Sequence, residues 1–103
     1  MAVEVYAVSK NGDFSQDFGF RDQLRRSAVS IAATIAEGKE RATISESIRY
    51  LYIAKGSSGE FKTHLMIAQR IGYIEQVCAK NLTQRVERTS AKLGALIRTL
   101  KRK

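Results

Sequence analysis

The chain has 103 residues, one cysteine and a formal net charge of +8, and 44% of its residues are hydrophobic. This length fits a single domain, residues 1–103, of ordinary globular composition. It contains neither an apolar run of about 18 residues nor a signal-peptide pattern, so we expect no membrane helix and no secretion. The lone Cys78 cannot form an internal disulfide, which suits a cytoplasmic location.

The beginning of the chain predicts a short helix followed by a connection. Proline is absent and glycines are scattered, which favours helices throughout. Residues 1–10 fit a first helix that must dock on the rest of the protein, because so short a helix is marginal in water. Asp13 to Gly19 is expected to be a connection with two aromatic anchors, Phe14 and Phe18.

Two long helices are expected next. Gln23 to Gly38 places apolar residues on one face and is rich in alanine and serine, so we interpret it as the central helix of a bundle. Thr43 to Glu46 is a capping box, and the apolar spacing after it predicts a helix of about 28 residues. The apolar pattern continues on both sides of the small residues Gly56 to Gly59, although each glycine lowers helix stability by about 0.8–1 kcal/mol relative to alanine. We interpret them as a place where another helix crosses closely.

The last helix combines a heptad seam with a strong positive charge. The seam consists of Leu82, Val86, Thr89, Leu93, Leu96 and Leu100, with Ile97 beside it. Residues 79–103 hold eight basic residues and one acidic residue, whereas residues 1–78 are nearly balanced. Such an excess attracts nucleic acid, although basic residues can also serve only to keep a helix soluble. The expected nucleic-acid contacts are Arg85, Arg88, Lys92, Arg98, Lys101, Arg102 and Lys103.

No set of residues predicts catalysis, a metal site or a cofactor. His64 is the only histidine, and with Glu60 it supplies too few ligands for zinc, so a structural or surface role is favoured. Cys78 has no neighbour that would activate a thiol. No glycine-rich phosphate motif occurs. We therefore expect a protein that is not an enzyme.

A polar set near the first long helix allows two interpretations. Glu37 and Arg41 are four residues apart and can pair on a helix. The pair is either a solvated ion pair at a helix end or, together with Arg25 and Arg26, part of a polar network between helices or subunits that fixes assembly.

Three motifs resemble one bacterial family. They are QLRRSAVSI from Gln23, IAEG from Ile35, and YIAKGSSGEFKTHLMIAQRIGYI from Tyr52. They resemble the "S23" proteins, four-helix-bundle proteins encoded in intervening sequences of large-subunit ribosomal RNA genes. The chain is also similar to the accessory variability protein of diversity-generating retroelements. The resemblance extends from about Val3 to Leu100. It implies an antiparallel up-down bundle, a homo-oligomer in the form of a closed pentameric ring, and the network interpretation of the polar set.

Together, these observations predict an all-α, antiparallel up-down four-helix bundle with a short first helix. So few helices cannot cover every apolar stripe, which independently favours a homo-oligomer. The leading hypothesis is a non-enzymatic accessory protein that binds nucleic acid, RNA rather than DNA and structured RNA such as ribosomal RNA. The alternative is a protein-interaction scaffold that partners a reverse transcriptase or a ribonucleoprotein.

Overall fold

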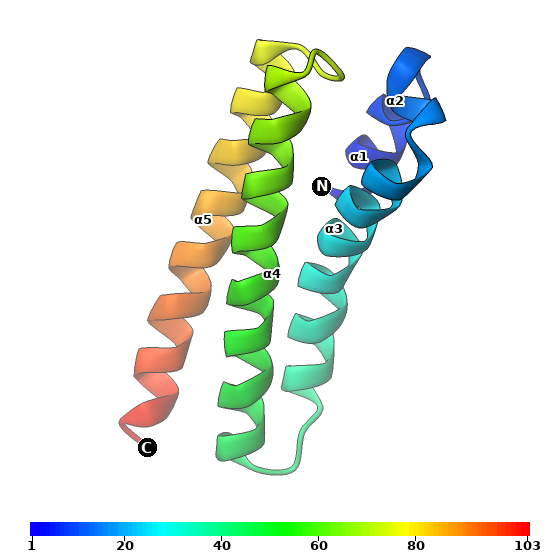
Figure 1. Cartoon of the computed structure of the whole chain (residues 1–103). Helices are drawn as coiled ribbons and strands as arrows, with labels where there is room; N and C mark the ends of the chain where they lie inside the picture. Colours follow the sequence, from blue (N-terminus) through cyan, green and yellow to red (C-terminus); the bar gives the residue numbers. More distant parts are fainter.

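The computed structural model describes all 103 residues and contains five helices and no strand. The helices are α1 (Ala2–Val8), α2 (Gly12–Gln16), α3 (Phe18–Lys39), α4 (Ile44–Arg70) and α5 (Gln76–Lys101). The three long helices run antiparallel in chain order (Figure 1). The molecule is elongated, with principal extents of 48 × 21 × 17 Å. The predicted all-α bundle with a short first helix is confirmed. No helix is long and apolar enough to cross a membrane.

The helix at the centre of the bundle is α4, which corrects the expectation for Gln23 to Gly38. α4 packs against both α3 and α5, whereas α3 and α5 have no close backbone contact with each other. α3 is instead contacted by α4 on one side and by α1 and α2 near its beginning. The small side chains of Gln23 to Gly38 therefore permit close packing, but they do not give this helix the central position.

The chain before α3 forms one more helical turn than expected. Residues 12–16 are the helix α2, where the sequence predicted only a connection. Phe14 anchors this turn as expected, since it is 1% exposed and its ring stacks on Tyr73 at 5.1 Å. Phe18 is not an anchor: it is 58% exposed and begins α3. The Asp17 carboxylate caps α3 by accepting from the Phe20 backbone N–H at 3.3 Å.

α4 is continuous through its four small residues, as predicted. The Thr43 hydroxyl caps it by accepting from the Glu46 backbone N–H at 3.1 Å. The contact with α3 at the small residues is made by serine, because Ser57 Oγ lies 3.0 Å from Ser30 Oγ. Gly56 and Gly59 point elsewhere: a Cβ atom at either position would meet nothing within 4 Å. α3 thus crosses at the serines, and neither glycine packs against another helix.

The seam of α5 departs from the predicted heptad near its end. Leu82, Val86 and Leu93 are buried as expected, but Ile97 is 3% exposed whereas Leu96 is 39% exposed. An α-helix has 3.6 residues per turn, so a strict heptad drifts by about 20° with each repeat. After two repeats, this drift is enough to carry Leu96 out of the core and Ile97 into it.

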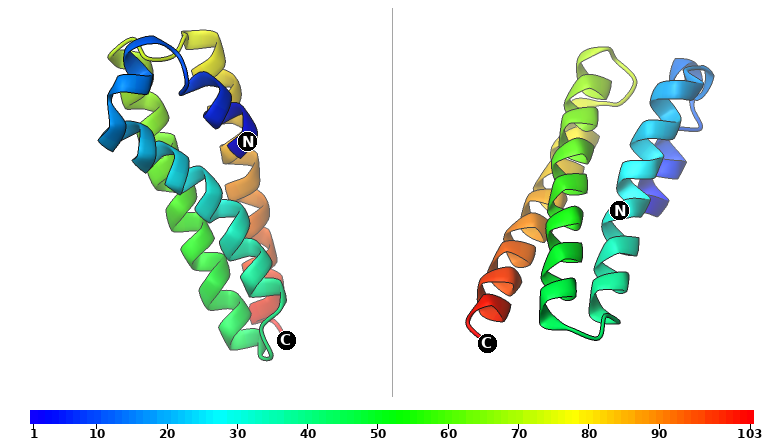
Figure 2. Two further views of the ribbon diagram at one scale, coloured as in Figure 1. Left: turned by 90° about the vertical axis from the view of Figure 1, so that its right-hand side faces the viewer. Right: turned by 60° about the horizontal axis from the view of Figure 1, so that its bottom comes forward.

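The core is covered unevenly along the bundle. A larger cluster of twelve buried residues draws on α1, α2 and all three long helices, and Val5 of α1 is fully buried in it. A smaller cluster consists of Leu51, Ala54, Leu93 and Ile97, from α4 and α5 only. Figure 2 shows why: α1 lies beside the upper halves of α3 and α5 and does not reach their lower halves. The first helix therefore closes only one end of the bundle.

Candidate nucleic-acid interface

The structure divides the cations predicted on the last helix into two groups. Five of them are exposed and form no ion pair with a carboxylate: Arg88, Lys92, Arg98, Arg102 and Lys103. The other two already have partners within the chain. Arg85 Nη1 donates to Glu4 Oε1 at 3.0 Å, and Lys101 Nζ donates to the Tyr52 hydroxyl at 2.7 Å.

The Glu4–Arg85 pair joins α1 to α5. A hydrogen bond from its own backbone N–H lowers the pKa of Glu4 to about 2, and the N-terminal ammonium, 3.0 Å from Glu4 Oε2, and then Arg85 contribute to the same shift. The carboxylate therefore stays charged, and the pair stays formed, in mildly acidic solution. Arg85 thus docks the first helix, a role that could not be predicted from the sequence because its partner lies 81 residues away.

α4 adds two cations that the charge pattern of the last helix could not reveal. Lys55 and Lys62 are seven residues apart and therefore lie on the same side of α4, facing α5. Lys62 Nζ lies 3.6 Å from Glu87 Oε1, a pair in which both side chains are about half exposed. Lys55 Nζ donates to the backbone carbonyl of Ser90 at 3.3 Å and to its hydroxyl at 3.2 Å. The spacing of the two lysines, two helical turns apart, is the feature of the sequence that could have indicated a shared face.

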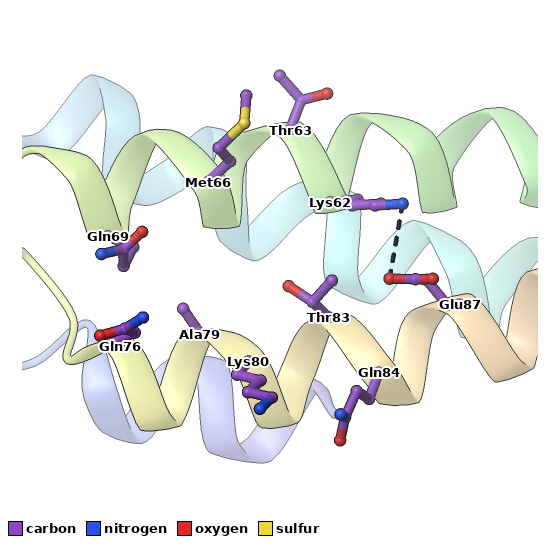
Figure 3. A pocket seen from close by; sticks show the side chains of 10 residues that line it. All are labelled: Lys62, Thr63, Met66, Gln69, Gln76, Ala79, Lys80, Thr83, Gln84 and Glu87. Atoms are coloured by element: carbon purple, nitrogen blue, oxygen red, sulfur yellow. Dashed lines mark ion pairs between the residues drawn. The ribbon is translucent and has the colours of Figure 1, made fainter.

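A cavity of about 590 Å³, lined mainly by residues with polar side chains, lies between α4 and α5. Its lining consists of Lys62, Thr63, Met66, Gln69, Gln76, Ala79, Lys80, Thr83, Gln84 and Glu87. Figure 3 shows Gln69 and Gln76 facing each other from the two helices at one end, with the Lys62–Glu87 pair at the other. Lys62 and Glu87 also line a second cavity of about 430 Å³, which continues along the same two helices to Lys55 and Ser90. We call this continuous feature the α4/α5 groove.

A different polar cavity, of about 510 Å³, lies between α3 and α4. It is lined by Gln23, Arg26, Ser27, Ser30, Ser57, Glu60 and His64. Ser27 Oγ lies 3.5 Å from His64 Nδ1, but its hydroxyl donates to the backbone carbonyl of Leu24 at 2.9 Å. His64 also packs edge-on against Phe20, with ring centroids 5.9 Å apart. His64 therefore connects α4 to α3, which is the structural role expected from the sequence.

The polar set of the first long helix does not form one network within the chain. Arg25 Nε donates to Ser9 Oγ at 2.7 Å and its guanidinium lies over the ring of Tyr6. Arg26 lines the cavity between α3 and α4.

At the other end of α3, Arg41 and Glu37 form an exposed pair with an N···O distance of 3.6 Å. The guanidinium of Arg41 also lies over the ring of Tyr50, 4.4 Å from its centroid. The two arginines near the beginning of α3 thus have different neighbours from the Glu37–Arg41 pair.

Cys78 is half-buried, and burial raises the pKa of its thiol.

Two of the comparisons with known proteins, with family models and with solved structures, find matches. The family model of the 23S rRNA-intervening sequence protein matches residues 1–95. A crystal structure at 1.70 Å resolution, of a protein of unknown function from the S23 ribosomal protein family of Bacteroides thetaiotaomicron VPI-5482, has the same fold. It aligns with a TM-score of 0.85 and 24% identity, over 93% of this chain and 87% of that chain. A comparison with curated proteins finds no significant match. Because the family model spans nearly the whole bundle, the chain belongs to the 23S rRNA-intervening sequence protein family.

Proposed function

We propose that this protein is a non-enzymatic, cytoplasmic accessory protein that binds structured RNA, such as ribosomal RNA, through a basic helical surface. The observation that carries the proposal is the set of five exposed cations on and after α5 that have no carboxylate partner. Cations in this state can neutralise phosphates, and the release of the counterions that were condensed on the nucleic acid drives binding. The description of the family, which refers to 23S rRNA, supports RNA as the nucleic acid.

Filter binding to a structured RNA across a salt series tests the proposal. We expect the logarithm of the binding constant to fall linearly with the logarithm of salt concentration, by roughly 0.7–0.9 per phosphate contact. We also expect weak discrimination between RNA sequences, because contacts to phosphates carry no sequence information. Absence of binding at about 50 mM salt, or tight binding that is insensitive to salt, would contradict the proposal.

The protein is proposed to act as a homo-oligomer, and the resemblance to the S23 and retroelement proteins supports a pentameric ring. One observation in the structure favours assembly: large apolar side chains are exposed on the outer surface of α4. They are Tyr52, Ile53 and Ile67. Exposed apolar patches on a small protein commonly mark interfaces. Arg25, Arg26, Glu37 and Arg41 remain proposed as polar contacts between subunits.

The same apolar surface favours a second candidate function, a scaffold that partners a reverse transcriptase or a ribonucleoprotein. A pull-down with and without nuclease separates the two functions. A partner that stays bound after nuclease treatment supports the scaffold, whereas a partner lost with the RNA supports RNA binding.

A further inference from the structure

Lys55 is a half-buried cation without a counterion. Its ammonium donates to the carbonyl and hydroxyl oxygens of Ser90 on α5, at 3.3 and 3.2 Å, and it pairs with no carboxylate. Charged groups that are withdrawn from water are normally paired with an opposite charge. The acid in this part of the groove, Glu87, is paired with Lys62 instead.

A second cation reaches the same point. One helical turn beyond Ser90, a Cβ atom at Gly94 would lie 3.6 Å from Lys55 Nζ and 3.5 Å from Arg98 Nη1. Two positive groups from different helices therefore flank one backbone position that has no side chain. Their mutual repulsion raises the energy of the empty groove, and a bound anion would remove it.

We propose that this point binds a phosphate of a nucleic-acid backbone, held by Lys55, Arg98 and the hydroxyl of Ser90. The proposal rests on the proposed function and identifies the surface that binds the RNA. From this phosphate, the RNA strand follows the α4/α5 groove past Lys62 toward Lys80. Lys55 and Lys62 are two turns, about 10.5 Å, apart along α4. The threonine and glutamine side chains of Figure 3 then supply hydrogen bonds to sugar and phosphate oxygens.

The groove is suited to one backbone and not to a duplex entering edge-on. Packed helix axes lie only 8–10 Å apart, so a duplex cannot enter between α4 and α5, whereas the phosphates of one strand can follow the surface of the groove. Glu87 is the one carboxylate that lines it. Its negative charge repels phosphate, and its ion pair with Lys62 makes that lysine less available to a phosphate.

The test compares two double variants that remove the same charge. Lys55→Gln with Arg98→Gln empties the phosphate site, whereas Arg88→Gln with Arg102→Gln removes two cations that do not line the groove. With a structured RNA at fixed salt, we expect the groove variant to lose about tenfold more affinity than the control, as for one lost charge-assisted hydrogen bond. Its salt slope should also fall by about one for each lost phosphate contact.

Glu87→Gln should strengthen RNA binding, because it removes the negative charge from the groove. A gain in affinity cannot result from a folding defect, so this variant keeps the test independent of folding. Its control is Glu60→Gln, which removes the same charge from the cavity on the other side of α4. Equal losses in the two double variants, or equal gains in the two glutamine variants, would mean that RNA responds only to net charge. That result overturns the groove and leaves the proposed function intact.

Inorganic phosphate distinguishes a failure of the proposed function from a failure of the site. Even if no RNA binds, phosphate titrated into the unaltered protein should shift the backbone amide NMR signals of Ser90 and Gly94. The same titration should leave these signals unchanged in the Lys55→Gln, Arg98→Gln variant. Absence of those shifts in the unaltered protein overturns the phosphate site.

Discussion

Tyr73 shows how one residue ties the connections of this bundle together. It lies between α4 and α5, its ring stacks on Phe14 of α2, and its hydroxyl donates to Asp17 Oδ2 at 2.8 Å. The same carboxylate group caps α3 through its other oxygen. Through this side chain, the connection between α4 and α5 therefore meets the junction of α2 and α3, which at Asp17 lies 56 residues earlier in the sequence.

Tyr73→Phe should lower the melting temperature at pH 7, because the ring stays and only the hydrogen bond to Asp17 is lost. That bond raises the pKa of Tyr73 above its ordinary value. A raised pKa in the folded state means that the stabilisation is complete below about pH 10 and is lost as the pH rises through the folded pKa. Thermal unfolding followed by circular dichroism should therefore show a difference from the unaltered protein at neutral pH that disappears in strong alkali.

Tyr6→Phe is the matched control for this prediction. Tyr6 is exposed, its hydroxyl has no partner in the chain, and its ring keeps the contact with Arg25. The control should melt as the unaltered protein does at both pH values. A Tyr73→Phe variant that behaves in the same way would show that the bond to Asp17 contributes nothing to stability.

The candidate interface marks the limit of what single residues could predict. The sequence shows that the positive charge lies on the last helix, because charge is counted along the chain. It could not show that Arg85 binds Glu4 or that Lys101 binds Tyr52, since these partners are 81 and 49 residues away. It also could not show that Lys55 of α4 and Arg98 of α5 both lie beside Gly94, because that depends on how the two helices pack.

At the scale of elements, local signals predicted the long helices well. Periodic apolar spacing and the Thr43 cap define α4 through two glycines that propensity alone would treat as a break. The parts that were wrong depend on tertiary contacts. α2 forms because Phe14 is buried under Tyr73, and the end of the α5 seam moves to Ile97 because of helical drift.

Thr43→Ala should destabilise the protein by about 1 kcal/mol, the usual cost of losing a threonine cap. The reason is that the Glu46 backbone N–H would lose the hydroxyl that it donates to. Denaturant unfolding measures the change. Thr63→Ala, an exposed threonine inside the same helix, is the control and should be neutral or slightly stabilising, since alanine favours helix. Equal effects in the two variants would contradict a capping role.

Gly56→Ala and Gly59→Ala should each stabilise the isolated chain by up to about 0.8–1 kcal/mol, because alanine favours the helix and nothing lies within 4 Å of the new Cβ atom. Gly38→Ala should not, because its Cβ atom would lie 3.1 Å from Tyr50 Cβ. Denaturant unfolding at a concentration where the protein is monomeric tests both. A destabilising effect at Gly56 would show that this face is already in contact.

At the scale of the whole molecule, the two open glycines and the exposed apolar side chains lie on the same helix. α4 has its core face toward α3 and α5, and its outer surface carries Tyr52, Ile53 and Ile67 beside Gly56. A helix that is central within the chain and apolar on its outer face is suited to a second copy. In a closed ring, this surface would meet a different surface of the next subunit.

Gly56→Arg should therefore prevent assembly while leaving each chain folded. The arginine meets no atom of its own chain at the new Cβ position, so the bundle tolerates it, but it places a charge in the proposed contact. Light scattering of the unaltered protein should give five times the 11.5 kDa mass of one chain, and the variant should give a smaller species with an unchanged helical spectrum. Ala91→Arg adds the same charge to the exposed surface of α5 and should leave the oligomer intact. A mass near 11.5 kDa for the unaltered protein would exclude the ring, and a Gly56→Arg variant that still assembles would move the interface away from α4.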